Sequence, residues 1–196
     1  MKYPLPVYDA YAIVKNVLEQ VETLKLDKDK IVLMGESAAA GLIIAVAQEM
    51  IKRDEIHLIR LLMPISIFDS SFVDGTLPHD KMTKPEQNWY MLLETALRFC
   101  SVDYERQKQT DTYLYPNLMS NEVCAKLPRT IVMTTEFDCY RRSSANIAEK
   151  IHQNGKLVDF VCHPGLNHVG AFHTKDDTVF QLNFWQDIAL LISEHI

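Results

Sequence analysis

The spacing of apolar residues along the chain predicts helices that alternate with short apolar strands. Helical periodicity runs from Ala10 to Leu24, with Asp9 available as an N-cap and the polar run 27–30 as the stop. The apolar run 31–34 shows no alternation, which is typical of a strand buried on both faces of a parallel sheet. The segment Ala38–Lys52 is apolar on nearly all sides and therefore predicts a buried helix.

The rest of the chain continues this alternation. Further strands are expected at Leu58–Met63, which Pro64 ends, and at Thr130–Thr135 and Leu157–Cys162. Further helices are expected at Trp89–Phe99, Ser143–Asn154 and Asp176–Glu194, with Asn154-Gly155 as the C-cap of the second of them. The pattern predicts a single domain over residues 1–196, built as a doubly wound, mostly parallel α/β sheet. Residues 66–127 are too many for an ordinary connection and predict a cap inserted between the second and third strands.

Length and composition agree with one globular domain. The chain has 196 residues, of which 47% are apolar and 23% charged, so it can bury a core without disulfides or metals. Its net charge is −6, without a long run of one sign, which argues against a nucleic-acid or anionic-membrane surface. Small molecules and other proteins are the expected partners.

The cysteines and the apolar stretches point to a cytoplasmic protein. Cys100, Cys124, Cys139 and Cys162 lie far apart, with no C-x-x-C pair and no histidine at zinc-ligand spacing, so free thiols in a reducing compartment are expected. The first residues, MKYPLPVYDAY, contain no apolar core of a signal peptide. The longest apolar stretch, Ala38–Ala47, is far short of the roughly 18 residues of a membrane span.

The first candidate for chemistry is Ser37, which lies between a predicted strand and a predicted buried helix. Its surroundings read GESAAAG, and a sharp strand-to-helix turn there would expose the serine Oγ as a nucleophile. The N–H of Ala38, at the start of the helix, would then face a developing oxyanion. The structural alternative is a serine N-cap among small residues chosen for close packing.

Two more candidates follow the later strands. Asp138 comes directly after the third strand, and His168 lies in HPGLNH directly after the fourth. Carboxyl ends of parallel strands meet at one edge of a sheet, and the order serine, aspartate, histidine is that of hydrolase triads on α/β sheets. Asp138 could instead cap a turn, and His168 could be an ordinary histidine. The competing choices are Asp69, after the second strand, and His163 and His173, which flank the loop.

These motifs resemble the hormone-sensitive-lipase family of α/β-hydrolases, whose elbow typically reads GDSAGG and whose later motifs have the forms D-x-L-x-D and H-G-F. The counterparts here are GESAAAG at 35–41, EFDCYRR at 136–142 and HPGLNHVGAF at 163–172. Residues 3–11, YPLPVYDAY, look like the segment that enters the helix before the elbow. The resemblance therefore runs through essentially the whole chain.

The resemblance implies a role for each matching residue. Ser37 would be the nucleophile, Asp138 the orienting acid, His168 the general base and Ala38 one oxyanion donor. The chain departs from the family pattern at Glu36, Ala39 and Ala40, and at 139–142, where leucine and a second acid are usual.

The family's upstream HGGG-type loop, which supplies further oxyanion donors, has no counterpart in the chain. The sequence therefore looks like the C-terminal part of a truncated α/β-hydrolase fold. Loss of one oxyanion donor typically slows a reaction by about 10²–10³-fold, so slow catalysis is expected. The strand at 31–34 would lack one neighbour, and we expect a homodimer or larger assembly to cover that apolar edge.

The leading interpretation is a serine hydrolase that cleaves carboxylic esters with short or medium acyl chains. Phe68, Trp89 and Tyr90 are expected to bind the ester substrate, and Phe72, Leu93, Leu97 and Phe99 are further candidates for the wall, although most could be plain cap core. No metal or organic cofactor is implied. The alternative is a catalytically weak or silent protein that binds a small apolar ligand, because the family resemblance includes hormone receptors on this fold. A peptidase or a thioesterase on the same fold stays open.

Overall fold

Four apolar runs of the chain pair side by side in one parallel sheet. The computed structural model describes residues 3–72, 84–168 and 179–196. The strands are β1 (Val32–Glu36), β2 (Leu61–Ile65), β3 (Arg129–Phe137) and β4 (Leu157–Asn167), in the spatial order β1-β2-β3-β4. All three neighbouring pairs are parallel, so the four carboxyl ends lie at the same edge of the sheet.

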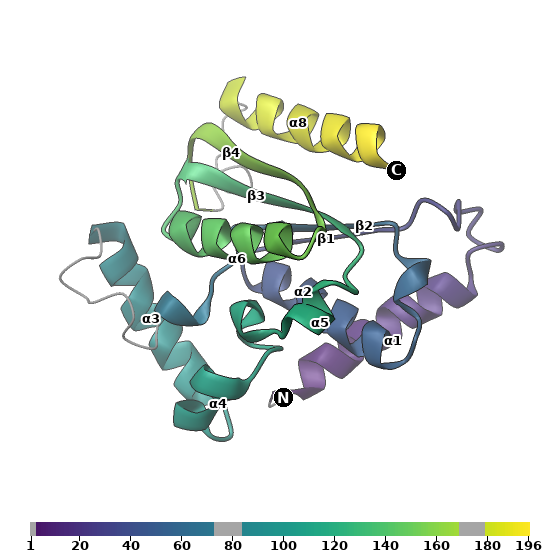
Figure 1. Ribbon diagram of the computed structural model, residues 1–196. Helices are drawn as coiled ribbons and strands as arrows, with labels where there is room; N and C mark the ends of the chain where they lie inside the picture. Colours follow the sequence, from purple (N-terminus) through teal and green to yellow (C-terminus); the bar gives the residue numbers. More distant parts are fainter. Residues whose placement is uncertain (1–2, 73–83, 169–178) are drawn as a thin grey trace.

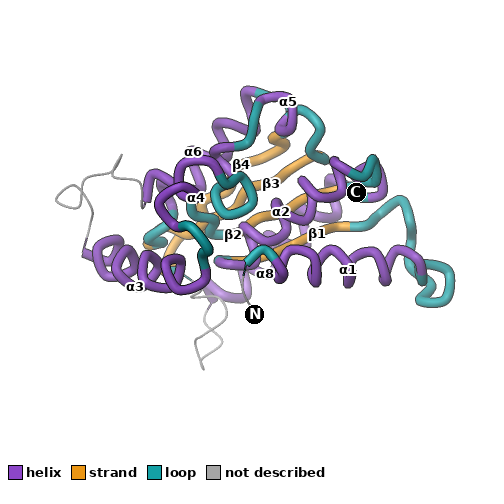
Figure 2. Tube along the Cα trace, turned by 90° about the horizontal axis from the view of Figure 1, so that it is seen from below, coloured by secondary structure: helices purple, strands orange, loops and turns teal. Residues whose placement is uncertain are grey.

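Helices pack on both faces of this sheet, which confirms the doubly wound α/β class. The α-helices are α1 (Leu5–Glu19), α2 (Ala38–Lys52), α3 (Lys84–Cys100), α4 (Tyr104–Thr110), α5 (Asn121–Cys124), α6 (Arg141–Gln153) and α8 (Val179–His195). Ile44 of α2 and Ile147 of α6 share one core cluster with Val132, whereas Phe184 of α8 packs with Met63 on the opposite face (Figure 1). Helix α1 packs on α2 and runs along the β1 side of the molecule (Figure 2).

Helix α2 has the predicted bounds, but α1 begins and ends earlier than expected. Helix α1 starts at Leu5 rather than at Ala10, and it ends at Glu19 rather than near Leu24. Pro6 lies in its first turn, where proline costs nothing because those N–H groups have no intrahelical partner. The apolar residues after Glu19 continue in turns rather than in a helix.

The second strand is shifted toward the C-terminus of its predicted range. Residues Ile56–Leu58 form a 3-10 helix, and β2 then runs through Pro64 instead of ending there. Pro64 pairs with Gly35 of β1 and has no paired residue in β3, so its missing N–H is tolerated on that side. All five residues of β2 are buried, as a central parallel strand requires.

The last two strands are longer than predicted. Strand β3 continues to Phe137, so Asp138 follows it at once. Strand β4 continues through Pro164 and Gly165 to Asn167, with a register shift against β3 near its end. Proline is tolerated there because β4 is an edge strand of the described sheet. His163 therefore lies inside the strand rather than after it.

Helix bounds differ elsewhere by a few residues. Helices α3 and α6 extend beyond the predicted ranges at their N-terminal ends, and Asn154 is the C-cap of α6, followed by Gly155 at φ 69° as expected. Helix α8 is described from Val179, and the predicted start at Asp176 lies outside the described residues. Helix α4 has little apolar periodicity and was not predicted.

Strand β1 is less buried than its apolar sequence predicts. It lies at one edge of the sheet, and Met34 is 44% exposed. The expectation of burial on both faces is therefore wrong for this strand, because Leu33 packs against the core beside α2 whereas Met34, on the opposite face, stays exposed. Among the helices of the described residues, none has the length and apolar character needed to cross a membrane.

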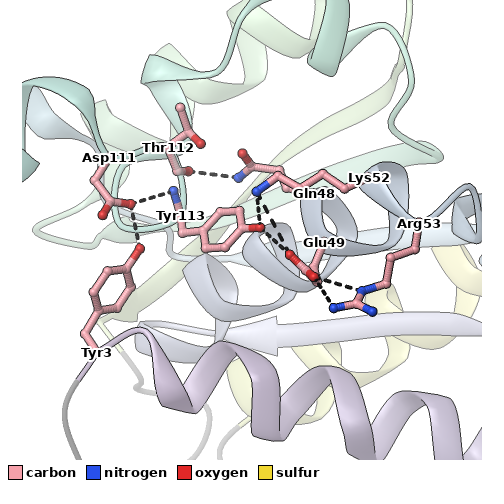
Figure 3. A network of polar contacts seen from close by, with 8 residues as sticks. All are labelled: Tyr3, Gln48, Glu49, Lys52, Arg53, Asp111, Thr112 and Tyr113. Carbon is pink, nitrogen blue, oxygen red and sulfur yellow. Dashed lines mark hydrogen bonds and ion pairs between the residues drawn. The ribbon is translucent and has the colours of Figure 1, made fainter.

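A polar network holds the 66–127 segment against Tyr3 and helix α2 (Figure 3). The Tyr3 hydroxyl donates to the Asp111 carboxylate at 2.6 Å, and the Tyr113 hydroxyl donates to the largely buried Glu49 of α2. Gln48 of α2 donates to the Thr112 carbonyl at 2.8 Å. Because α2 starts next to Ser37, these bonds tie the 66–127 segment to the helix that carries the candidate nucleophile.

Candidate active site

Ser37 occupies a strained turn between β1 and α2. Its φ of 56° and ψ of −120° are unusual for a residue with a side chain, and its N–H donates to the Ile65 carbonyl at 2.9 Å. A Cβ on Gly35 would lie 2.4 Å from the carbonyl oxygen of Ala39, so only glycine fits there. The Ser37 side chain makes no capping hydrogen bond to α2. Ser37 therefore occupies the N-cap position of α2 without capping the helix through its side chain, and Oγ is left for another partner.

That partner is the imidazole of His168. Ser37 Oγ lies 2.9 Å from His168 Nε2, and His168 Nδ1 lies 3.0 Å from Asp138 Oδ1. Asp138 Oδ1 also accepts the backbone N–H of Tyr140 at 2.7 Å. The three predicted residues, far apart in sequence, thus form one hydrogen-bonded relay at the carboxyl ends of β1, β3 and β4.

The surroundings of Asp138 favour its ionised form. Burial alone would raise the pKa of Asp138, but its hydrogen bond with His168, their charge interaction and the Tyr140 N–H hold that pKa below its usual value. Asp138 therefore stays an acceptor at neutral pH. Burial also raises the pKa of Glu36, the residue beside the serine, against the opposing charge effect of His168.

The alternative candidates for the acid and the base, Asp69 and His163, contact other residues. Asp69 is buried and accepts hydrogen bonds from Ser143 at 3.0 Å and Asn146 at 2.9 Å, which joins the loop after β2 to α6. His163 Nε2 lies 3.3 Å from Asp187 of α8. His173 lies outside the described residues.

A small apolar pocket opens beside Ser37. Its volume is about 190 Å³. It is lined by Ser37, Ala38, Phe68, Trp89, Leu92, Leu93, Ala96 and Tyr140. The predicted Phe68 and Trp89 are part of the wall, and Ala38 is the first residue of α2. Because N–H groups of a first helical turn have no intrahelical partner, the Ala38 N–H suits an oxyanion.

Other predicted wall residues are not placed in the pocket. Leu97 is buried in a core cluster with Tyr104 and Tyr115, and Phe99 is 85% exposed. Tyr90 lies on α3, but its side chain and that of Phe72 are outside the described part of the chain.

Sequence reasoning missed Tyr140, Leu92 and Ala96. The spacing of Trp89, Leu92, Leu93 and Ala96 places them on one face of a helix, and this signal could have identified two of the missed residues. Nothing in the sequence indicated that Tyr140, two residues after the predicted acid, turns back into the pocket.

Among the described residues, one group of side chains could act as ligands of a metal ion. Ligand atoms of Asp138, Cys139 and His168 lie within 4.8 Å of one another. Burial, with the charge of Asp138, raises the pKa of the Cys139 thiol, so the thiolate that binds metals is disfavoured. The hydrogen bond between Asp138 and His168 already accounts for the other two groups.

Comparison with known proteins places this geometry in a family. A family model described as alpha/beta hydrolase fold matches residues 1–173. An arylesterase of Saccharolobus solfataricus is 24% identical over 156 residues, which are 79% of this chain and 48% of that protein. The chain thus spans about half the length of this relative.

Solved esterases share the fold. Carboxyl esterase 2 of the fungus Tuber melanosporum aligns over 100% of this chain and 63% of its own, with a TM-score of 0.77 and 20% identity. A thermostable esterase of Pseudomonas putida aligns over 100% of this chain and 60% of its own, with a TM-score of 0.78 and 21% identity. The resemblance to hormone-sensitive-lipase-like proteins is thereby confirmed, and the chain belongs to the α/β-hydrolase fold family.

Proposed function

We propose that the chain is a serine hydrolase that cleaves carboxylic esters through an acyl-enzyme. The observation that carries this proposal is the relay from Ser37 through His168 to Asp138, with distances of 2.9 Å and 3.0 Å, beside an apolar pocket. Related proteins include an arylesterase and several solved esterases, which supports the same reaction class.

The reaction follows from the positions of these groups. Ser37 Oγ attacks the ester carbonyl carbon while its proton passes to His168 Nε2, and the Ala38 N–H donates to the resulting oxyanion. The imidazolium, stabilised by the Asp138 carboxylate, returns the proton to the leaving alcohol oxygen as the C–O bond breaks. Water then attacks the acyl-enzyme with the same proton transfers and releases the carboxylic acid.

The pocket supports short to medium acyl chains. Its volume of about 190 Å³ and its wall of Phe68, Trp89 and aliphatic side chains suit a small apolar acyl group. Four of its residues come from α3, so we propose that the 66–127 segment acts as a cap that sets acyl specificity within a single domain, with Tyr90 as a further contact.

A second function has one observation in its favour. The pocket beside Ser37 is small and lined mostly by apolar side chains, which also suits a small apolar ligand. A weakly active or silent protein that binds a small apolar ligand in the same pocket is therefore the alternative.

Covalent labelling separates these functions. We expect a fluorophosphonate to add one phosphonyl group to the native chain, detected by intact mass and mapped to the peptide that contains Ser37. Denatured protein is the control, because an unactivated serine does not react. A folded chain that remains unlabelled would contradict the hydrolase and favour the binding protein.

We also propose that two copies associate through the β1 edge. Met34 of β1 is 44% exposed, and Leu5 and Ile13 of α1 are 50% and 67% exposed. Unpaired strand edges beside apolar patches favour association. Sedimentation at micromolar concentration is expected to show a dimer that Met34→Lys dissociates, whereas Met91→Lys on α3 leaves it intact. A stable monomer without dye-binding apolar surface would rule out this assembly.

The site of action is proposed to be a reducing compartment such as the cytoplasm. All four cysteines are free thiols. The ester substrate is the proposed partner, and the proposed chemistry uses no cofactor.

A further inference from the structure

Two aromatic rings contact the imidazole of His168. The Tyr140 ring lies 4.8 Å from the imidazole centroid at an interplanar angle of 87°, and the Trp89 ring lies 5.1 Å away at 67°. Both are edge-to-face arrangements, which aromatic rings prefer. Tyr140 and Trp89 also contact each other, with centroids 6.4 Å apart.

The two rings come from different parts of the fold. Tyr140 is 3% exposed and lies in the turn between Asp138 and α6, where its backbone N–H donates to the Asp138 carboxylate. One residue therefore contacts the acid through its backbone and the histidine through its ring. Trp89 comes from α3 of the 66–127 segment and lines the pocket beside Ser37.

Tyr140 is itself held in place by neighbouring rings. Phe68 lies 5.8 Å from Tyr140, and Tyr115, which is completely buried, lies 6.1 Å from Phe68. The Tyr140 ring is thus fixed by packing as well as by its backbone position.

We propose that Tyr140 and Trp89 are positioning residues that hold the His168 imidazole in its reactive orientation. The proposal rests on the proposed function and extends it to the second half of the reaction. In the free protein, Ser37 and Asp138 each fix one ring nitrogen. Once Ser37 Oγ is acylated, it has no proton to share, and Asp138 is the remaining hydrogen-bonding partner within the relay.

Ring contacts do not depend on the state of Ser37. They therefore keep the imidazole aligned while it activates the water that cleaves the acyl-enzyme. Because Trp89 also lines the pocket, a bound acyl chain packs against a ring that touches the histidine. Esters with different acyl chains are then expected to differ more in kcat than in KM.

The test compares Tyr140→Leu, which removes the ring, with Tyr140→Phe, which keeps it. The matched control is Tyr104→Leu, another buried tyrosine of the same apolar cluster, which is not among the residues that line the pocket. With an acetate ester, Tyr140→Leu is expected to lower kcat roughly 2- to 12-fold, the rate change that corresponds to a lost aromatic pair, with KM nearly unchanged. Tyr140→Phe and Tyr104→Leu are expected to retain kcat.

Two results would overturn the proposal. They are a wild-type kcat in Tyr140→Leu, or an equal loss in Tyr140→Phe, which would assign the effect to the hydroxyl. Trp89→Leu serves as a second variant if Tyr140→Leu does not fold, and the same loss of kcat is expected because it removes the other ring.

A second readout does not require turnover. In NMR spectra of protein with labelled histidine, the His168 ring signals are expected to shift and broaden in Tyr140→Leu but not in Tyr104→Leu. If the wild-type chain neither labels nor turns over, the proposed function fails while these spectra still decide the positioning role. Unchanged His168 signals in Tyr140→Leu would then reject it.

Discussion

Replacement of Ser37 by alanine is expected to abolish ester hydrolysis while leaving the fold intact. The serine Oγ is the atom that forms the acyl bond, so its removal leaves only the pocket and the oxyanion donor. Loss of a triad serine typically lowers kcat by roughly 10⁴–10⁶-fold. The measurement is turnover of a short-chain p-nitrophenyl ester, with circular dichroism to confirm folding.

The backbone strain at Ser37 bears on the expected stability of the Ser37→Ala variant. Its φ of 56° is tolerated no better by alanine, so the variant keeps the same strained turn and is expected to unfold at nearly the same temperature. Ser193→Ala on α8, where the exposed hydroxyl donates to the Leu190 carbonyl, is the matched control and is expected to keep full activity. Residual turnover in Ser37→Ala equal to that of Ser193→Ala would assign hydrolysis to another group.

The order of elements could be predicted from sequence because each buried element carries its own apolar pattern. Helix α2 has the bounds that its sequence predicts, since small and aliphatic residues continue from Ala38 until the polar Lys52-Arg53 end. Boundaries at prolines were less accurate. The sequence pattern places the start of the first helix after Pro6 and the end of the second strand at Pro64, but a first helical turn and a strand side without a paired residue both accept a residue without an N–H.

The candidate site was predictable for a topological reason. Parallel strands that end at one edge bring together the residues that follow them, so Ser37, Asp138 and His168 could be grouped without coordinates. The distances between them could not be predicted, because β4 runs five residues beyond its predicted end and His168 follows its last residue directly. The contacts of Tyr140 and Trp89 with His168 depend on side-chain directions in a turn and in the 66–127 segment, which no local pattern encodes.

Removal of the imidazole at position 168 is expected to have the second large effect. His168→Ala should lower both turnover and the rate of fluorophosphonate labelling by roughly 10⁴-fold or more, because triad residues act as a unit. His163→Ala is the matched variant, since His163 is also buried and lies five residues earlier on the same chain segment.

The two histidines differ in what they contact, and this decides between them. His163 lies 3.3 Å from Asp187 and packs against Phe184, so its replacement leaves a cavity under α8. We expect His163→Ala to lose about 2–5 kcal/mol of stability while keeping turnover per folded molecule, because truncation of a large buried side chain to alanine costs about that much. His168→Ala is expected to lose a similar amount of stability, because it also removes a buried ring, but to leave no turnover per folded molecule. If His163→Ala removes turnover while His168→Ala keeps it, the general base is not the residue that the relay indicates.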